Sequence, residues 1–205
     1  MWKSIMGKAA DKLDDTSLDL LFRSARTFNE FTAEPVTDAD LKAIYDILKM
    51  GPTSANCQPQ RILFLRTPAA KERLKPALSE GNLAKTMAAP VTAVLGYDLK
   101  FYEHLPKNFP HNQTAKSWFE GKPAHIETTA FRNSSLQGAY FMIAARAVGL
   151  DVGGMSGFDN AKVDKEFWPD GTVKSNFLCN LGHGDGAKLF PRSPRFNFDE
   201  VCKVL

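Results

Sequence analysis

Two arginines and a serine in one short stretch have the clearest chemical potential in this sequence. Arg23, Ser24 and Arg26 fall within one turn of a segment that carries a helical stripe of apolar residues. Two guanidiniums and a hydroxyl so close together can grip a phosphate, because each arginine presents a planar fork of donors. The alternative interpretation is a solvated helix face, since clusters of charge on helices are common.

Two further motifs have the groups that a bound heterocycle needs. Asn82 and Lys85 are three residues apart and therefore adjacent on a helix, where an amide and an ammonium suit a flat ring with carbonyls and ring nitrogens. In "GMSGFD", 154–159, the glycines let backbone approach a ligand and Ser156 adds a hydroxyl. The alternatives are a surface pair and a turn before a helix capped by Asp159.

The tail and one polar loop are also candidates for ligand binding. Arg192 and Arg195 stand among prolines in "LFPRSPRF", 189–196, which suits either an anion clamp or an ordinary basic tail. The stretch "GPTSANCQPQ", 51–60, is polar and rich in turn-forming residues between apolar runs. It is either a simple helix-to-strand connection or a loop shaped to hold something.

Other kinds of catalytic site find little support in the sequence. The four histidines have no metal-ligand spacing among themselves, and the three cysteines form no C-x-x-C pair, so no metal site is expected. Cys57 is interpreted as a small core residue. No Ser-His-Asp or Cys-His set can be assembled, and G-x-G-x-x-G is absent. Scattered cationic and amide groups instead suit a phosphorylated heterocycle whose own ring does the chemistry.

Length and composition favour one domain, and the order of the helices and strands expected along the chain favours the α+β class. The 205 residues are 43% hydrophobic and 24% charged, which is enough for one core, and we expect an extension over residues 1–15 and a single domain over 16–205. No apolar run approaches the ~18 residues of a membrane span, and the N-terminus lacks the apolar stretch of a signal peptide, so a cytoplasmic protein is expected. A net charge of +3 does not indicate nucleic acid.

Several helices and three strands would have to position these groups. Thr37 is expected to cap a helix that Gly51-Pro52 ends, and Thr67-Pro68 to begin another. Short apolar runs predict buried strands, and a long apolar stretch predicts a mostly buried helix. The strands are expected at 61–66, 90–97 and 175–184, and the long helix at 124–149. The irregular segment 98–123 is either a flap or a packed loop.

These pieces, in this order, resemble the nitroreductase family of flavin-dependent oxidoreductases. The resemblance lies in "RSAR", "GPTSANCQP", "NLAK", "GMSGF" and "RSPR". It implies an α+β fold with a central mixed antiparallel sheet flanked by helices, and an intertwined homodimer with FMN at the subunit interface and NADPH or NADH as hydride donor. No side chain is implied as a nucleophile. The cofactor-binding positions implied are Arg23, Ser24, Arg26, Pro52, Thr53, Ser54, Asn56, Asn82, Lys85, Met155, Ser156, Gly157, Arg192 and Arg195.

Within the family, "NFPHN", "ETTAFRNSS", "MSGFD", "VKSN" and "GHGD" are similar to the malonic semialdehyde reductases of pyrimidine degradation. That closer resemblance implies reduction of 3-oxopropanoate to 3-hydroxypropanoate. Relatives often carry Glu where Ser156 stands, and a neutral side chain there fits an anionic aldehyde. Arg132 is the candidate for the substrate carboxylate, because Asn133, Ser134 and Ser135 beside it are unusual inside a helix and suggest a lined pocket. The alternative is that these polar residues make contacts across the dimer. A broad nitroaromatic or quinone reductase and a non-enzymatic flavin-binding protein remain as alternatives.

Overall fold

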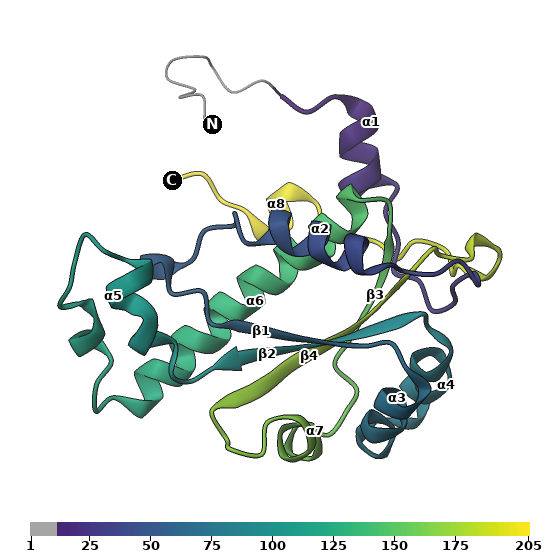
Figure 1. Ribbon diagram of the computed structural model, residues 1–205. Helices are drawn as coiled ribbons and strands as arrows, with labels where there is room; N and C mark the ends of the chain where they lie inside the picture. The colour runs from purple at the N-terminus through teal and green to yellow at the C-terminus, as the bar shows by residue number, and fades with distance from the viewer. Residues whose placement is uncertain (1–11) are drawn as a thin grey trace.

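The computed structural model describes residues 12–205 (Figure 1). Of the expected extension 1–15, residues 1–11 lie outside the described residues, and the first helix, α1, begins at Asp15. The boundary between residues 15 and 16 stays a prediction. No helix in the described part of the chain is both long and apolar enough to cross a bilayer.

A four-stranded sheet forms the centre of the molecule. Its order is β1-β2-β4-β3, and all three pairings are antiparallel. Alternate residues of β2 serve opposite faces, since Ala93 and Leu95 join one core cluster and Val94 joins another. Helices cover both faces, so every residue of β2 is buried. The strands are β1 (Gln60–Leu65), β2 (Val91–Asp98), β3 (Asp151–Met155) and β4 (Val173–Gly182).

Strand β3 corrects the sequence-based expectation of three strands. Its five residues include Gly153 and Gly154, which have low strand propensity and hide the alternation of a half-buried strand. The stretch expected to be a ligand loop therefore begins inside the sheet. Only Ser156 to Asp159 form the connection to the next helix, and Asp159 caps that helix by accepting from Lys162 N at 3.1 Å.

Helices α2 and α6 cover one face of the sheet, and α3, α4 and α7 cover the other (Figure 1). The capping box expected at Thr37 is present, with Asp40 as its partner, and Thr67 caps α3. The long helix α6 packs Phe141 against Ile44 of α2 and against the sheet. The helices of the domain are α1 (Asp15–Leu18), α2 (Asp38–Leu48), α3 (Pro68–Leu74), α4 (Glu80–Ala88), α5 (Leu105–Asn108), α6 (Pro123–Ala147), α7 (Asn160–Phe167) and α8 (Phe198–Val201).

The segment 98–123 is a packed element with its own core. Phe101, Leu105 and Phe119 are buried there together with Cys57 from the polar loop. Short 3-10 turns at Phe101–His104 and Ala115–Trp118 flank α5. The sequence left a flap or a packed loop as the interpretations of this segment, and the structure of the single chain shows a packed segment. It lies beside the 51–60 loop at one end of the sheet (Figure 1).

Candidate functional site

Four arginines converge on one cavity where the N-terminal segment, the end of α6 and the tail meet. This cavity, which we call the arginine cavity, has a volume of about 370 Å³ and no carboxylate among the described residues that line it. Its charged lining residues are Arg26, Arg146, Arg192 and Arg195. So many cations without an acid favour an anionic ligand.

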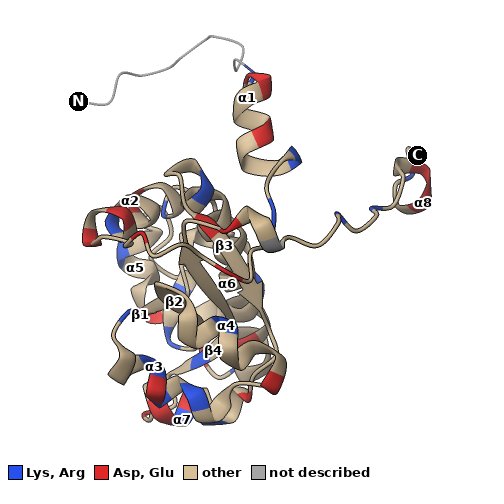
Figure 2. Ribbon diagram, turned by 90° about the vertical axis from the view of Figure 1, so that its right-hand side faces the viewer, with Lys and Arg blue, Asp and Glu red and all other residues tan. Residues whose placement is uncertain are grey.

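Hydrogen bonds tie the two segments that form this cavity. The Arg26 guanidinium donates to the carbonyl of Phe190, and Arg192 Nη2 donates to Ala25 O at 2.9 Å. Arg195 Nη1 donates within the tail, to Ser193 O at 2.9 Å. Figure 2 shows the tail as an extended segment with basic positions along it, ending in α8. The structure thus brings together Arg26, Arg192 and Arg195 from opposite ends of the sequence.

Arg23 and Ser24 do not line the arginine cavity. Arg23 Nε donates to Asp19 Oδ1 at 2.7 Å, and its Nη2 lies 2.9 Å from Asp15 Oδ1. The cause is a π-helical turn over Asp19–Arg23, closed by Ser24 N donating to Asp19 O at 2.9 Å. A wider turn changes which residues share a face of the helix. Arg23 and Arg26 therefore do not point to one phosphate site, as their spacing in the sequence had suggested. Phosphate binding by Arg23 and Ser24 stays a prediction.

Arg146 is the residue of this cavity that the sequence analysis missed. It lies in the last turn of α6, is half-buried, and donates from Nη1 to Leu21 O at 3.0 Å. Burial lowers the pKa of Arg146, Cys179 and the carboxylate of Asp151 act in the opposite direction, and the charge of Arg192 adds to the lowering. The available signal was an arginine late in a helix that is otherwise apolar there.

A second cavity adjoins the first and contains Lys85. This lysine cavity has a volume of about 660 Å³ and shares Asn29 and Phe190 with the arginine cavity. Lys85 Nζ donates to Asn29 Oδ1 at 3.2 Å. A ligand with a phosphate in one cavity therefore has room beside the Lys85 ammonium in the next. Asn29 was not among the residues singled out from the sequence.

The position of Lys85 depends on a buried pair in the sheet. Asn180 Nδ2 donates to Lys85 O at 3.3 Å, while Thr92 Oγ1 donates to Asn180 Oδ1 at 2.7 Å. Asn180 is 1% exposed and Thr92 is fully buried. These contacts fix α4 on the sheet, and no motif in the sequence signalled them.

Asn82, one helical turn before Lys85 on α4, contacts the 155–157 turn. Asn82 Nδ2 donates to Gly157 O at 2.9 Å, and a Cβ at Gly157 would stand 2.5 Å from that nitrogen. Met155 Sδ accepts from Thr86 Oγ1 at 3.4 Å, and Ser156 is exposed. The absence of a Cβ at Gly157 thus lets the Asn82 side chain approach the backbone, whereas the sequence had suggested that a ligand would do so. Neither Asn82 nor this turn lines the arginine or lysine cavity.

The loop containing Pro52, Thr53, Ser54 and Asn56 lies elsewhere in the same chain. Ser54 N donates to Asn133 Oδ1 at 2.8 Å, and Asn56 Nδ2 donates to Asn108 O at 2.7 Å. Figure 1 shows this loop beside α5, at the opposite end of the sheet from the 190–195 tail. None of the four residues lines the arginine or lysine cavity.

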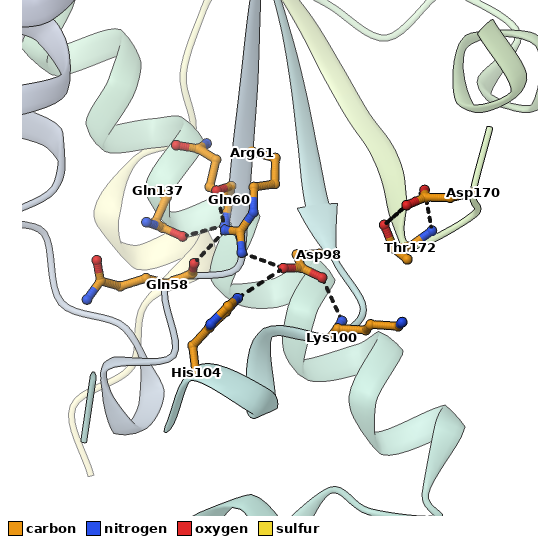
Figure 3. Close-up of polar contacts among 9 residues, drawn as sticks. All are labelled: Gln58, Gln60, Arg61, Asp98, Lys100, His104, Gln137, Asp170 and Thr172. Carbon is orange, nitrogen blue, oxygen red and sulfur yellow. Dashed lines mark hydrogen bonds and ion pairs between the residues drawn. The ribbon is translucent and has the colours of Figure 1, made fainter. Parts of the chain in front are cut away.

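The conformation of this loop is strained and held from one side. Ala55, Asn56 and Gln58 have φ of 49°, 49° and 41°, in the left-handed region that costs a residue with a Cβ about 1 kcal/mol or more. Arg61 Nη1 donates to Gln60 O at 2.9 Å and to Gln58 O at 3.2 Å, and the guanidinium also pairs with Asp98 (Figure 3). Strain of this kind clusters at binding sites.

Arg132 lies on an exposed face of α6. It lines a third cavity, of about 780 Å³, with Tyr97, Glu127 and Phe131 among its neighbours. The next two residues of "FRNSS" turn inward, where Asn133 holds Ser54 and Ser134 Oγ donates to Gly96 O at 3.0 Å. Within one chain Arg132 is therefore separate from the arginine and lysine cavities, and its role with a substrate stays a prediction.

Comparison with known proteins identifies the family. The model of the nitroreductase family matches residues 23–183. A protein of Burkholderia lata, named as a candidate NADH dehydrogenase/NAD(P)H nitroreductase, is 62% identical over 192 residues, which cover 94% of this chain and 98% of that protein. The chain belongs to the nitroreductase family.

Solved structures confirm the expected fold class. A candidate nitroreductase from Bacillus subtilis superposes with a TM-score of 0.83 at 21% identity, covering 93% of this chain and 99% of the other. A candidate nitroreductase from Exiguobacterium sibiricum, crystallised in complex with FMN, gives a TM-score of 0.81 at 15% identity, covering 96% and 100%. At such identities the likeness concerns the fold.

Proposed function

We propose that this protein is an FMN-dependent oxidoreductase that takes hydride from NADPH or NADH. The observation that carries the proposal is the arginine cavity, in which no described lining residue is acidic, beside Lys85 on a nitroreductase fold. The Exiguobacterium protein of the same fold binds FMN, and the Burkholderia relative is named for NAD(P)H chemistry. Bound FMN would supply a ring that accepts and returns hydride.

The residues present fit this cofactor. A phosphate dianion suits Arg26, Arg192 and Arg195, and each charged hydrogen bond contributes roughly 1.5–3 kcal/mol. Lys85 would place a cation at the flavin ring and stabilise negative charge there. Asn82, one helical turn before Lys85 on α4, and the Met155–Gly157 turn that it contacts would orient the ring edge.

A second copy of the chain would complete the site. The protomer leaves large apolar side chains exposed on α2, on α6 and in the tail, which favours association. They include Tyr45, Ile47, Phe131, Leu136, Tyr140, Phe196, Phe198, Val201 and Val204. We infer a homodimer in which the strained loop with Pro52, Thr53, Ser54 and Asn56 reaches the flavin of the partner.

The proposed substrate is 3-oxopropanoate, reduced to 3-hydroxypropanoate. Ser156 is neutral and exposed, so it would not repel a carboxylate. Arg132, brought by the second copy, would pair with that carboxylate. The Burkholderia relative's name favours a second candidate, a nitroaromatic or quinone reductase on the same scaffold.

A spectrum and a substrate panel test the proposal. The purified protein should be yellow and release FMN on denaturation. A colourless protein that FMN cannot reconstitute would disprove the proposal of a flavin cofactor. Steady-state kcat/KM for 3-oxopropanoate, a nitroaromatic and a quinone then separates the two candidates. Arg132→Ala should raise KM for 3-oxopropanoate more than for the neutral quinone. An equal rise for both would remove Arg132 from carboxylate recognition.

A further inference from the structure

We propose that Arg146, at the end of α6, is a fourth ligand of the anion in the arginine cavity and makes the protein selective for a phosphorylated flavin. The inference rests on the proposed function, because it takes the FMN phosphate as that anion. It adds a residue that the family resemblance did not include. Arg146 also differs from the other three arginines, since it alone comes from a regular, buried helix.

The first argument concerns charge. Arg146 is half-buried and shares its cavity with three more guanidiniums. The carboxylate of Asp151 favours its charge, but no carboxylate of the described residues forms an ion pair with it. An unpaired cation in that setting is unfavourable, because it has lost water and gained like-charged neighbours. A phosphate dianion in the cavity removes both penalties at once.

The second argument concerns geometry. Among the described residues, the Arg146 guanidinium has one hydrogen-bond partner, the carbonyl oxygen of Leu21, which Nη1 reaches at 3.0 Å. This bond orients the planar group and leaves donors for another acceptor, as bidentate binding of a phosphate requires. Arg192 and Arg195, in contrast, come from a tail without regular secondary structure. Arg146 thus provides the most fixed cation of the cavity.

The third argument concerns the assembly of the cavity. Three of the arginines donate hydrogen bonds to backbone carbonyls of the segments that enclose the cavity. The pairs are Arg146 with Leu21 O, Arg192 with Ala25 O and Arg26 with Phe190 O. A phosphate that binds all three would join α6, the N-terminal segment and the tail. Ligand binding and closure of the cavity are therefore coupled.

Equilibrium binding to the apoprotein tests this role without measuring turnover. Flavin fluorescence quenching gives the Kd of FMN and of riboflavin, which lacks the phosphate, for wild type, Arg146→Met, Arg146→Lys and the control Arg66→Met. Arg66 is an exposed arginine paired with Asp38, outside the arginine cavity. For Arg146→Met we expect FMN binding to weaken about 10- to 100-fold and riboflavin binding to change less than about threefold. Arg146→Lys should recover part of the loss, and Arg66→Met should match wild type.

Each outcome decides the inference. Equal weakening of FMN and riboflavin in Arg146→Met, or unchanged FMN binding, would overturn it and leave the flavin proposal standing. If wild type binds no flavin, the proposed function fails, and protection against thermal unfolding by pyrophosphate becomes the readout. If pyrophosphate protects the Arg66→Met variant but not the Arg146→Met variant, Arg146 binds an anion, although not that of a flavin. Protection that survives in Arg146→Met would overturn it. Should Arg146→Met not fold, Arg146→Lys and Arg146→Gln decide by the same comparison.

Discussion

Lys85 shows how one charged side chain is set by contacts at both of its ends. Asn29 accepts from its ammonium, and Asn180 donates to its carbonyl. The spacing of Asn82 and Lys85 predicted two neighbours on a helix, which α4 provides, but the two side chains meet different partners. Sequence spacing fixes which residues share a helix face, whereas contacts from distant segments decide what each of them touches.

Lys85→Met tests the electrostatic part of the proposed function. Removing a cation beside the flavin ring should lower the reduction potential of the bound flavin by about 30–60 mV, because the reduced ring loses a stabilising charge. A dye-equilibrated spectroscopic titration measures the potential. Lys162→Met is the matched control, since Lys162 is exposed and lies 3.6 Å from Asp159. An unchanged potential in Lys85→Met would place the ring away from the lysine cavity.

The buried cysteines should be chemically inert in the folded protein. Burial raises the pKa of Cys57 to about 11 and that of Cys179 to about 12. With the exposed Cys202 replaced in Cys202→Ser, we expect no thiol to react rapidly with a disulfide reagent at pH 8, and both to react in denaturant. One rapid equivalent in the native protein would show that Cys57 is accessible in its loop.

The same two thiols make the free energy of unfolding depend on pH in the alkaline range. In the unfolded chain they ionise near their ordinary pKa of 9.0, while in the folded chain they stay protonated to higher pH. Their contribution is therefore fully present below pH 9 and is lost as the pH rises from about 9 to about 11 for Cys57 and about 12 for Cys179. Urea unfolding across that range measures the loss.

At the scale of elements, helix caps were predictable and the unusual turns were not. Thr37 and Thr67 cap helices as expected, and Asp159 caps α7 as in the alternative interpretation of its turn. A cap can be predicted because it is a local hydrogen bond between residues close in sequence. The π-helical turn at Asp19–Arg23 and strand β3 were not foreseen. Both depend on partners far along the chain: Arg146 holds Leu21 O, and β3 pairs with β4.

Two adjacent glycines of β3 give a matched test of how the N-terminal segment approaches the sheet. A Cβ at Gly153 would stand 2.4 Å from the backbone oxygen of Phe28, whereas at Gly154 the closest atom is Met142 Sδ at 3.4 Å. Gly153→Ala should therefore cost about 1–3 kcal/mol of stability, and Gly154→Ala should be neutral or stabilising. Chemical denaturation measures both.

Gly153→Ala should also affect the arginine cavity, because Thr27 bridges to Val152 and Arg26 precedes it. Displacement of residues 26–28 would weaken FMN binding along with stability. Similar stability for the two alanine variants would show that the N-terminal segment can move away from β3 at little cost.

At the scale of the whole molecule, the sequence motifs separate into two groups. Arg26, Lys85 and the tail arginines gather in adjoining cavities, while the 51–60 loop and Arg132 lie outside them. The fold class followed from the order of apolar runs, which is a property of one chain. The complete site was beyond prediction in detail, since it would require surfaces of two chains.

Removing residues 196–205 tests the inferred homodimer. This end carries five exposed apolar side chains, and a fully buried one contributes about 1.5–3 kcal/mol to association. We expect the dimer dissociation constant to rise at least about tenfold, as measured by sedimentation. Lys203→Glu, which keeps the apolar side chains, should associate like wild type. A truncated protein that stays dimeric at the same concentrations would locate the contact on α2 and α6 alone.

The bonds from Arg26 to Phe190 and from Arg192 to Ala25 have a consequence for biosynthesis. A cavity lined by residues 22–29 and 190–195 does not exist on a nascent chain whose 190–195 segment is still inside the ribosome. The sheet and its helices can form earlier, during translation. Loading with a nucleotide would thus follow synthesis of the 190–195 segment, and a chain that stops before this segment would fold without being able to retain the nucleotide.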